Sequence, residues 1–236
     1  HQGRDGSGAD GVNYTQLSDA IVAYTENTSS DFAAQIPVFV QQAEQRIYNT
    51  VQFPSLRKNV TGNATSGNKY LACPGDFLAV YSMAVITDVT GGNVNTGTYE
   101  YLLNKDVNFI RQSYPSPTDQ DVPRYYALFG RQYNDANELS FILGPTPDDD
   151  YYIELHYFYY PESIVTAGTS WLGDNFDSVL FYGALVEAAT YMKQEPDLVT
   201  LYNQKYMEAL QLAKRLGDGM ERQDAYRSGQ YRQKVT

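Results

Sequence analysis

Apolar residues recur at helical spacing in the first part of the chain. One such stripe lies in residues 13–24, and a second runs through residues 39–51 and ends before Pro54. Pro37 suits the first turn of the second helix, because proline lacks the amide hydrogen that a helix start leaves unpaired. The pattern therefore predicts two N-terminal helices.

The pattern is helical again towards the C-terminus. The segment 179–192 carries a single charged residue, Glu187, so this helix must be covered on most sides. A further helix restarts at Pro196, and we expect Gly217 and Gly219 to stop it. Its expected inward positions are Leu198, Tyr202, Tyr206, Ala209, Ala213 and Leu216.

Between the helical ends, short apolar or alternating runs are separated by turn signals. Gly91-Gly92, Asn134-Asp135 and Pro147-Asp148 are such signals. The segment 105–115 fits a short helix within this region. Several short strands at close spacing indicate a small antiparallel sandwich or barrel-like sheet.

These patterns together predict an α+β fold. Residues 13–56 and 170–216 form a helical bundle, and residues 57–169 form an antiparallel β domain inserted between its halves. Residues 1–12 are a Gly- and Asp-rich leader that we expect to be flexible. Residues 217–236 are expected to form an extended C-terminal arm.

The stretch "YYIELHYFYY", residues 151–160, is unusual for a half-buried strand because both of its faces are rich in aromatic residues. One face is expected to point into the β core, and it carries Tyr151, Ile153, Leu155, Tyr157 and Tyr159. The other face carries Tyr152, Glu154, His156, Phe158 and Tyr160. The chain has 22 Tyr and one Trp, and tyrosine suits surfaces that are wet before assembly and buried afterwards. Strands also favour aromatic residues in general, so composition alone leaves both interpretations open.

Composition and charge exclude several classes of function. The formal net charge of −11 argues against a protein that grips nucleic acid through phosphate contacts, but not against one that encloses DNA without holding it. Cys73 is the single cysteine, so an intrachain disulfide is impossible, and it fits a small buried apolar residue. Only His1 and His156 accompany it, which leaves almost no basis for a Cys/His zinc site.

The sequence offers little for catalysis. No nucleophile elbow, P-loop, dinucleotide fingerprint or HExxH motif is present. The run Asp148–150 fits a solvated turn better than a calcium loop. His156 and Glu154 share a strand face, as a general base and its orienting carboxylate would, but a hydrogen-bonded strand histidine fits equally. We therefore predict no catalytic residue, cofactor or metal site, and no enzyme activity.

Two groups of charged residues suggest structural roles. Glu187 lies in an apolar helix, where a charge is costly unless paired, and Arg46 on the second N-terminal helix is the candidate partner. We expect this ion pair to fix helix register. From Lys214 onward the chain has six basic and three acidic side chains, which fits either a disordered tail or an arm that orders on a partner. The candidate docking residues of the arm are Arg222, Tyr226, Arg227, Tyr231, Arg232 and Lys234.

Four stretches carry a family resemblance. They are "AEQRIY" at 43–48, "ELHYFYYPESI" at 154–164, "LFYGALVEA" at 180–188, and the spaced Tyr202, Tyr206, Ala209 and Leu210. In this order they resemble bacteriophage head-to-tail adaptor proteins over roughly residues 13–220. The specificity lies in the combination, since these are packing patterns rather than catalytic motifs.

The resemblance implies a homo-oligomeric ring, usually of about twelve subunits, beneath the portal protein of the capsid. Such rings extend the DNA channel, let DNA pass without sequence-specific binding, and offer a platform to the tail or nozzle protein. It further implies a virion location at the head-tail junction, assembly in the host cytoplasm, and docking of the arm after Gly217 on the portal. On this basis Tyr152, Phe158 and Tyr160 are expected to be covered by a neighbouring subunit or the tail. The sequence contains no run of about 18 apolar residues, so we expect no membrane-spanning segment and no membrane partner.

Two alternatives remain from the residues alone. An aromatic β-sandwich that stacks sugar rings would explain the many tyrosines, but not the apolar helix at 178–192 or the basic arm. A hydrolase with paired carboxylates, such as Glu154 and Asp150, is the other alternative, although nothing in the spacing singles that pair out.

Overall fold

The computed structural model describes the backbone of residues 11–132 and 135–229, and the side chains of 11–130 and 139–217. The chain divides into two compact units. The helical unit combines the chain up to Pro54 with the chain from Pro161 onward, and the β unit is Ser55–Tyr160. The segment 161–169, which the sequence pattern grouped with the β domain, lies in the helical unit.

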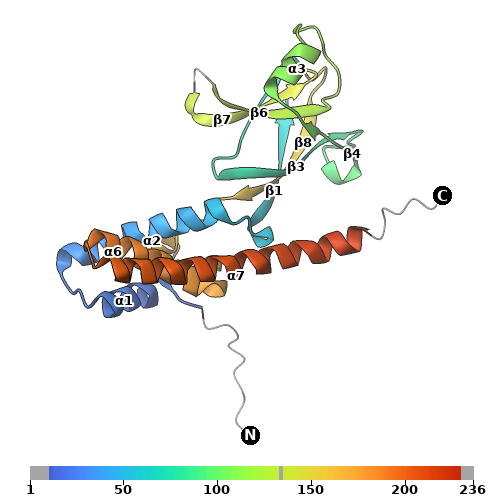
Figure 1. Cartoon of the computed structure of the whole chain (residues 1–236). Helices are drawn as coiled ribbons and strands as arrows, with labels where there is room; N and C mark the ends of the chain where they lie inside the picture. Colours follow the sequence, from blue (N-terminus) through green and yellow to red (C-terminus); the bar gives the residue numbers. More distant parts are fainter. Residues whose placement is uncertain (1–10, 133–134, 230–236) are drawn as a thin grey trace. The chain divides into compact units, whose positions relative to one another are not determined.

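The helical unit packs around one apolar helix (Figure 1). Its elements are α1 (Tyr14–Thr25), α2 (Ser30–Thr50), α4 (Ile164–Ala167), α5 (Trp171–Asn175), α6 (Asp177–Tyr191) and α7 (Pro196–Gly229). Helix α6 contacts α1, α2 and α7, as its nearly uncharged sequence predicts. At Gly183 a Cβ atom would lie 3.1 Å from Ala43 Cβ and 3.2 Å from Tyr206 Cε2, so a glycine lets three helices approach closely.

Helix α2 begins earlier than its proline suggests. Ser29 caps it by accepting a hydrogen bond from Phe32 N–H, and Pro37 lies inside the helix, so the prediction that Pro37 opens the first turn is wrong. Burial of Phe32 and Ile36 offsets the hydrogen bond that proline removes. Tertiary packing therefore outweighs a local breaker here.

Helix α7 continues through both of its predicted stops. It runs from Pro196 to Gly229, past Gly217 and Gly219, so the extended arm expected after Gly217 is helical as far as Gly229. A glycine inside a helix costs only about 1 kcal/mol relative to alanine, which the surrounding helix formers can offset. Tyr202, Tyr206 and Ala213 face inward as predicted, whereas Leu216 is 50% exposed.

The N-terminal leader is partly structured. Residues 1–10 lie outside the described part of the chain, but Val12 N–H donates to Gly173 O at 3.0 Å. Tyr14 N–H donates to Gly168 O at 2.8 Å. Asn13 then caps α1 through reciprocal hydrogen bonds with Gln16. Val12 therefore belongs to the helical unit rather than to a flexible leader.

The β unit contains two four-stranded sheets. The first has the order β1 (Arg57–Ala64), β8 (Tyr151–Tyr159), β3 (Phe77–Thr87) and β4 (Thr98–Tyr101), all antiparallel. The second has the order β2 (Tyr70–Ala72), β7 (Asp135–Gly144), β6 (Tyr125–Gln132) and β5 (Leu103–Asn104). In this second sheet β5 and β6 are parallel and the other pairs antiparallel. The described residues also include two short 3₁₀ helices, η1 (Pro54–Leu56) and η2 (Val94–Thr96).

The core of the β unit lies between the sheets. Met83, Ile153 and Leu155 of the first sheet pack with Phe141 and Leu143 of the second. The short helix α3 (Val107–Ser113), where one was predicted, covers the other face of the second sheet, and its Ile110 packs on Ala127 and Ile142 (Figure 1). The α+β prediction is confirmed.

Candidate functional site

Strand β8 occupies an inner position of the first sheet, between β1 and β3. Its residues Ile153, Leu155 and Tyr157 are buried in the core, as predicted. The opposite face of β8 therefore belongs to the outer face of a four-stranded sheet. Register places Arg57 of β1 opposite Phe158, and Asn59 opposite His156, so these side chains share that outer face.

A cation–aromatic cluster forms on this face around Tyr81. A register irregularity between Val80 and Ser82 of β3 brings Tyr81 onto β8, where its ring meets His156 edge-on at 5.0 Å and Phe158 at 6.2 Å. The Arg57 guanidinium carbon lies 4.2 Å from the Tyr81 centroid. Such a cation–π contact contributes about 0.5–1 kcal/mol at an exposed site. Tyr81 is itself 49% exposed, so the cluster presents a stacked aromatic surface to solvent.

Phe158 is already covered within the isolated chain. Its exposed fraction is 7%, with Tyr81 against its ring and the Arg57 guanidinium 6.0 Å from its centroid. The expectation that Phe158 is left for a neighbouring subunit to cover is therefore wrong. Tyr152 is half-buried and Tyr160 is 36% exposed, so both keep area that a partner can cover.

The electrostatics of this face favour the neutral form of His156. Burial and then the Arg57 charge lower the pKa of His156, and Glu154 opposes them. Desolvation, followed by the Glu154 carboxylate, raises the pKa of Tyr99 on β4. The lowered pKa favours the neutral imidazole at neutral pH, and the imidazole packs edge-on against Tyr81.

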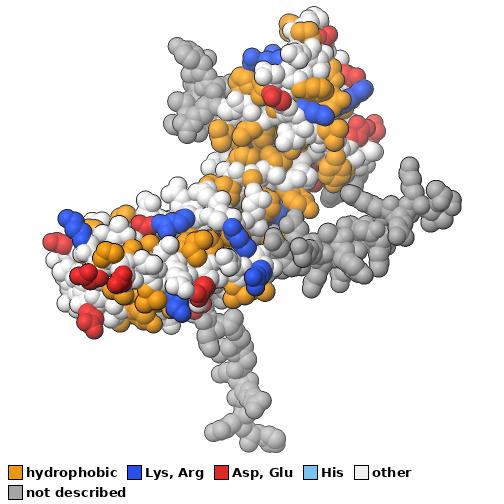
Figure 2. Space-filling view, viewed as in Figure 1, with side chains coloured by type: hydrophobic (Ala, Val, Ile, Leu, Met, Phe, Trp, Pro, Cys, Tyr) orange, Lys and Arg blue, Asp and Glu red, His pale blue; other side chains and the backbone are white. Residues whose placement is uncertain are grey.

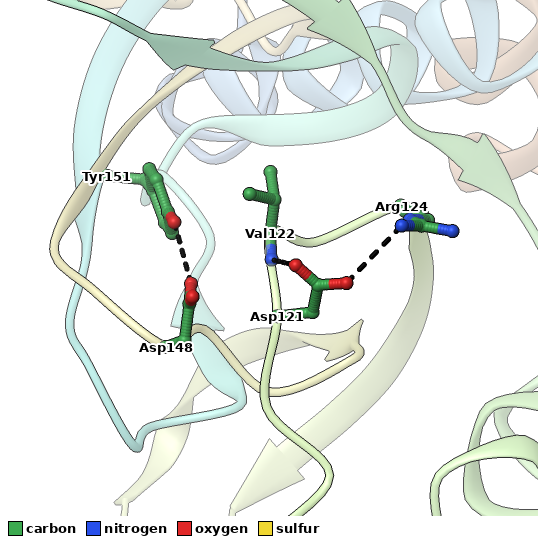
Figure 3. Close-up of polar contacts among 5 residues, drawn as sticks. All are labelled: Asp121, Val122, Arg124, Asp148 and Tyr151. Carbon is green, nitrogen blue, oxygen red and sulfur yellow. Dashed lines mark hydrogen bonds and ion pairs between the residues drawn. The ribbon is translucent and has the colours of Figure 1, made fainter.

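The acidic turn between β7 and β8 is exposed, as predicted for a solvated turn. Figure 3 shows the contacts of Asp148 and of the nearby Asp121. The Tyr151 hydroxyl donates to Asp148 Oδ1 at 2.6 Å, and burial followed by that carboxylate raises the pKa of Tyr151. Asp121, in the loop before β6, accepts a hydrogen bond from Val122 N–H and pairs with Arg124. Within the described residues, no group of three or more His, Cys, Asp or Glu side chains is placed to hold a metal ion.

Near this turn lies a cavity of about 360 Å³. It is lined by Asn63, Ala64, Thr65, Asp150, Tyr151 and Tyr152. Asp150 accepts a hydrogen bond from Ser66 N–H, while Glu154 interacts with Tyr99, so the two carboxylates of the hydrolase alternative have different partners.

An ion pair links helices α2 and α6. Arg46 Nη2 forms an ion pair with Glu187 Oε1, and the Arg46 guanidinium also lies 5.5 Å from the centroid of Tyr206 on α7. The Arg46 and Glu187 side chains are 39% and 24% exposed. One arginine thus contacts both helices that flank it. Its role in helix register remains a prediction.

Sequence reasoning missed Tyr81, because a register irregularity in β3 leaves no signature in the hydrophobic pattern. It missed Arg57, because its position opposite Phe158 depends on which strands pair. Of the predicted docking residues, Arg222, Tyr226 and Arg227 lie on the backbone of α7, and their side chains are outside the described part. Tyr231, Arg232 and Lys234 lie outside it entirely.

These features define an α+β protein whose aromatic and charged clusters lie on the faces of a sheet and of helices. Figure 2 shows apolar and charged side chains interspersed on one face of the helical unit. The chain matches the family model of the SU10 adaptor protein over residues 12–233. It belongs to this family of bacteriophage head-to-tail adaptors. No curated protein matches the chain. None of the described helices is long and apolar enough to cross a membrane.

Family membership gives the coarse function and location. The protein has the structural role of a phage adaptor and is a component of the virion.

Proposed function

We propose that this chain forms a ring of about twelve subunits that docks beneath the portal, extends the DNA channel and carries the tail or nozzle. The observation that carries the proposal is the family match, which covers residues 12–233 of the 236-residue chain. Three further features support it: the C-terminal segment, the outer face of the first sheet, and the net charge of the chain.

The first is the C-terminal part of α7. Beyond Lys214 the chain carries more basic than acidic residues, while the whole chain has a net charge of −11. Within α7 beyond Lys214 the basic and acidic residues balance, and the excess of positive charge comes from Arg232 and Lys234 after the helix. A C-terminal segment of this charge on an acidic body suits docking on a separate, acidic surface. We infer that the docking element begins as a helix and presents Arg222, Tyr226 and Arg227, followed by Tyr231, Arg232 and Lys234.

The second is the outer face of the first sheet. Tyr81 and Tyr101 are 49% and 65% exposed, and Tyr152 and Tyr160 also retain exposed area. Exposed tyrosines keep a monomer soluble through their hydroxyl groups, and their rings bury apolar area when a partner binds. We infer that a neighbouring subunit or the tail covers this face.

The third is the net charge of the chain, which would make the ring as a whole acidic. An acidic ring repels the phosphate backbone, so DNA slides through without being held. No base-reading contact is required for this passage.

Native mass spectrometry of the chain with and without its portal protein tests the proposal. We expect a ring of about twelve copies that binds the portal. A variant with Arg222, Arg227, Arg232 and Lys234 changed to Gln should lose portal binding. A matched variant with Lys69, Lys105, Lys193 and Lys205 changed to Gln should keep it. A monomer that ignores the portal and binds glycans would instead favour the carbohydrate-binding alternative.

A further inference from the structure

The chain crosses between its two units twice, after Pro54 and after Tyr160. Within the helical unit, the first crossing is anchored by Phe53, which is 1% exposed. Its ring lies 4.9 Å from Trp171 and 5.4 Å from Phe176. This anchor is apolar, so its strength does not depend on the protonation of any of the three side chains.

The second crossing is anchored by a carboxylate. Glu44 of α2 is 4% exposed, and its Oε1 accepts hydrogen bonds from Ser163 Oγ at 3.0 Å and Ile164 N–H at 3.2 Å. Ser163 is also the N-cap of α4, since its Oγ accepts from Val165 N–H. One oxygen of Glu44 therefore ties the start of α4 to α2, three residues after the β unit ends at Tyr160.

Among the described residues, the groups bonded to Glu44 are neutral donors. Burial raises its pKa to about 7, against the hydrogen bonds from Ser163 and Ile164, which lower it. No charged group is among these causes. The nearest cation on its own helix is Arg46, which is paired with Glu187 of α6. Glu162, beside the contact, is exposed and acidic, and α4 has no charged residue.

The contact is consequently linked to proton binding. In the closed arrangement the carbonyl oxygen of a neutral Glu44 still accepts both hydrogen bonds, without the cost of burying a charge. When the start of α4 separates from α2, water reaches the carboxylate and its ordinary pKa returns. The closed arrangement thus binds the proton more tightly, and rising pH favours opening.

We propose that Glu44 is a proton-linked latch on the crossing after Tyr160: mildly acidic pH holds the segment 161–168 on α2, and ionisation of Glu44 releases it. The Phe53 anchor stays closed throughout, so only one of the two crossings loosens. The proposal concerns the isolated chain and goes beyond the adaptor function.

Hydrogen exchange of the full chain tests the latch. The informative amides are Ile164, Ala167 and Gly168, the last two bonded to Ser163 O and Ile164 O. After correction for intrinsic exchange, linkage with pKa values of about 7 closed and about 4.5 open predicts an opening constant about tenfold larger at about pH 8.5 than at about pH 6. Val51 N–H, bonded to Ile47 O beside the first crossing, should not follow this rise.

Two variants assign the effect. Glu44→Gln keeps an acceptor oxygen of the same shape but cannot ionise, so the rise with pH should vanish. Glu208→Gln removes an exposed carboxylate from α7 and should keep the rise. A flat profile in the unmodified chain, an equal rise in Glu44→Gln, or a parallel rise at Val51 would each overturn the latch. These readouts need neither ring nor portal, so they are independent of the proposed function.

Discussion

The ion pair between Arg46 and Glu187 can be measured by a double-mutant cycle, with Arg46→Met, Glu187→Gln and both together. Two unit charges about 4 Å apart interact by about 4 kcal/mol at an effective dielectric constant near 20. Arg46 and Glu187 are 39% and 24% exposed, so solvent screening and side-chain ordering reduce this to a coupling of about 1 kcal/mol. Arg46→Met should cost about 0.5 kcal/mol more than Glu187→Gln, because it also removes the cation–π contact with Tyr206.

The assay is urea unfolding followed by tryptophan fluorescence. Trp171 is the only tryptophan, and it packs on Phe53 and Phe176 in the helical unit, so its emission reports that unit. Raising the salt concentration from about 0.05 to about 0.5 M should reduce the coupling. Arg124→Gln, which breaks an exposed pair in the β unit, is the control and should leave the Trp171 transition unchanged. A coupling below about 0.3 kcal/mol would refute a structural role for the pair. A coupling insensitive to salt would refute the solvent-screened charge interaction assumed for it.

Three further predictions follow from the packing and the charges. Gly183→Val should destabilise the helical unit by about 1–3 kcal/mol in the same assay, because a Cβ would press on two helices, whereas Gly75→Ala, with open space around it, should be nearly neutral. Burial opposes ionisation of Asp76, but hydrogen bonds from a lysine and a tyrosine outweigh it and hold its pKa below the ordinary value. Asp76 therefore stabilises the fold above its unfolded pKa and loses that contribution as pH falls through the folded pKa, so Asp76→Asn should lower Tm at neutral pH and converge with the unmodified chain in strong acid. Changing Tyr81 and Tyr101 together to Ser should leave the circular dichroism spectrum of the monomer unchanged but reduce the ring fraction in native mass spectra, and an unaltered ring fraction would remove this face from the interface.

The long-range architecture could be predicted because each segment has a strong period. The inner face of β8 and the buried surroundings of α6 follow directly from where apolar residues fall. Helix limits were harder to predict, since they depend on packing that the local sequence does not contain. Pro37 and Gly217 are breakers by propensity, yet both lie within helices.

The candidate site was predicted less completely than the fold. Phe158 alternates onto the outer face as expected, but Tyr81, displaced by a register irregularity, covers it. Glu44 stood out only as part of a family pattern, because its hydrogen-bond donors lie about 120 residues away in sequence. Such contacts depend on which segments the fold brings together, and a single sequence does not contain that information.

The pairing of β1 with β8 also affects how the helical unit can assemble. Helix α2 ends at Thr50 and α6 starts at Asp177, so contact between them closes a long loop. In the β unit, however, Arg57 lies opposite Phe158 across the first sheet. Once those strands have paired, the loop that remains to be closed is several-fold shorter, which lowers its entropic cost by on the order of 1 kcal/mol. Pairing within the inserted sheet thus brings the two halves of the helical unit closer along the chain. We expect the β unit to fold before these halves meet.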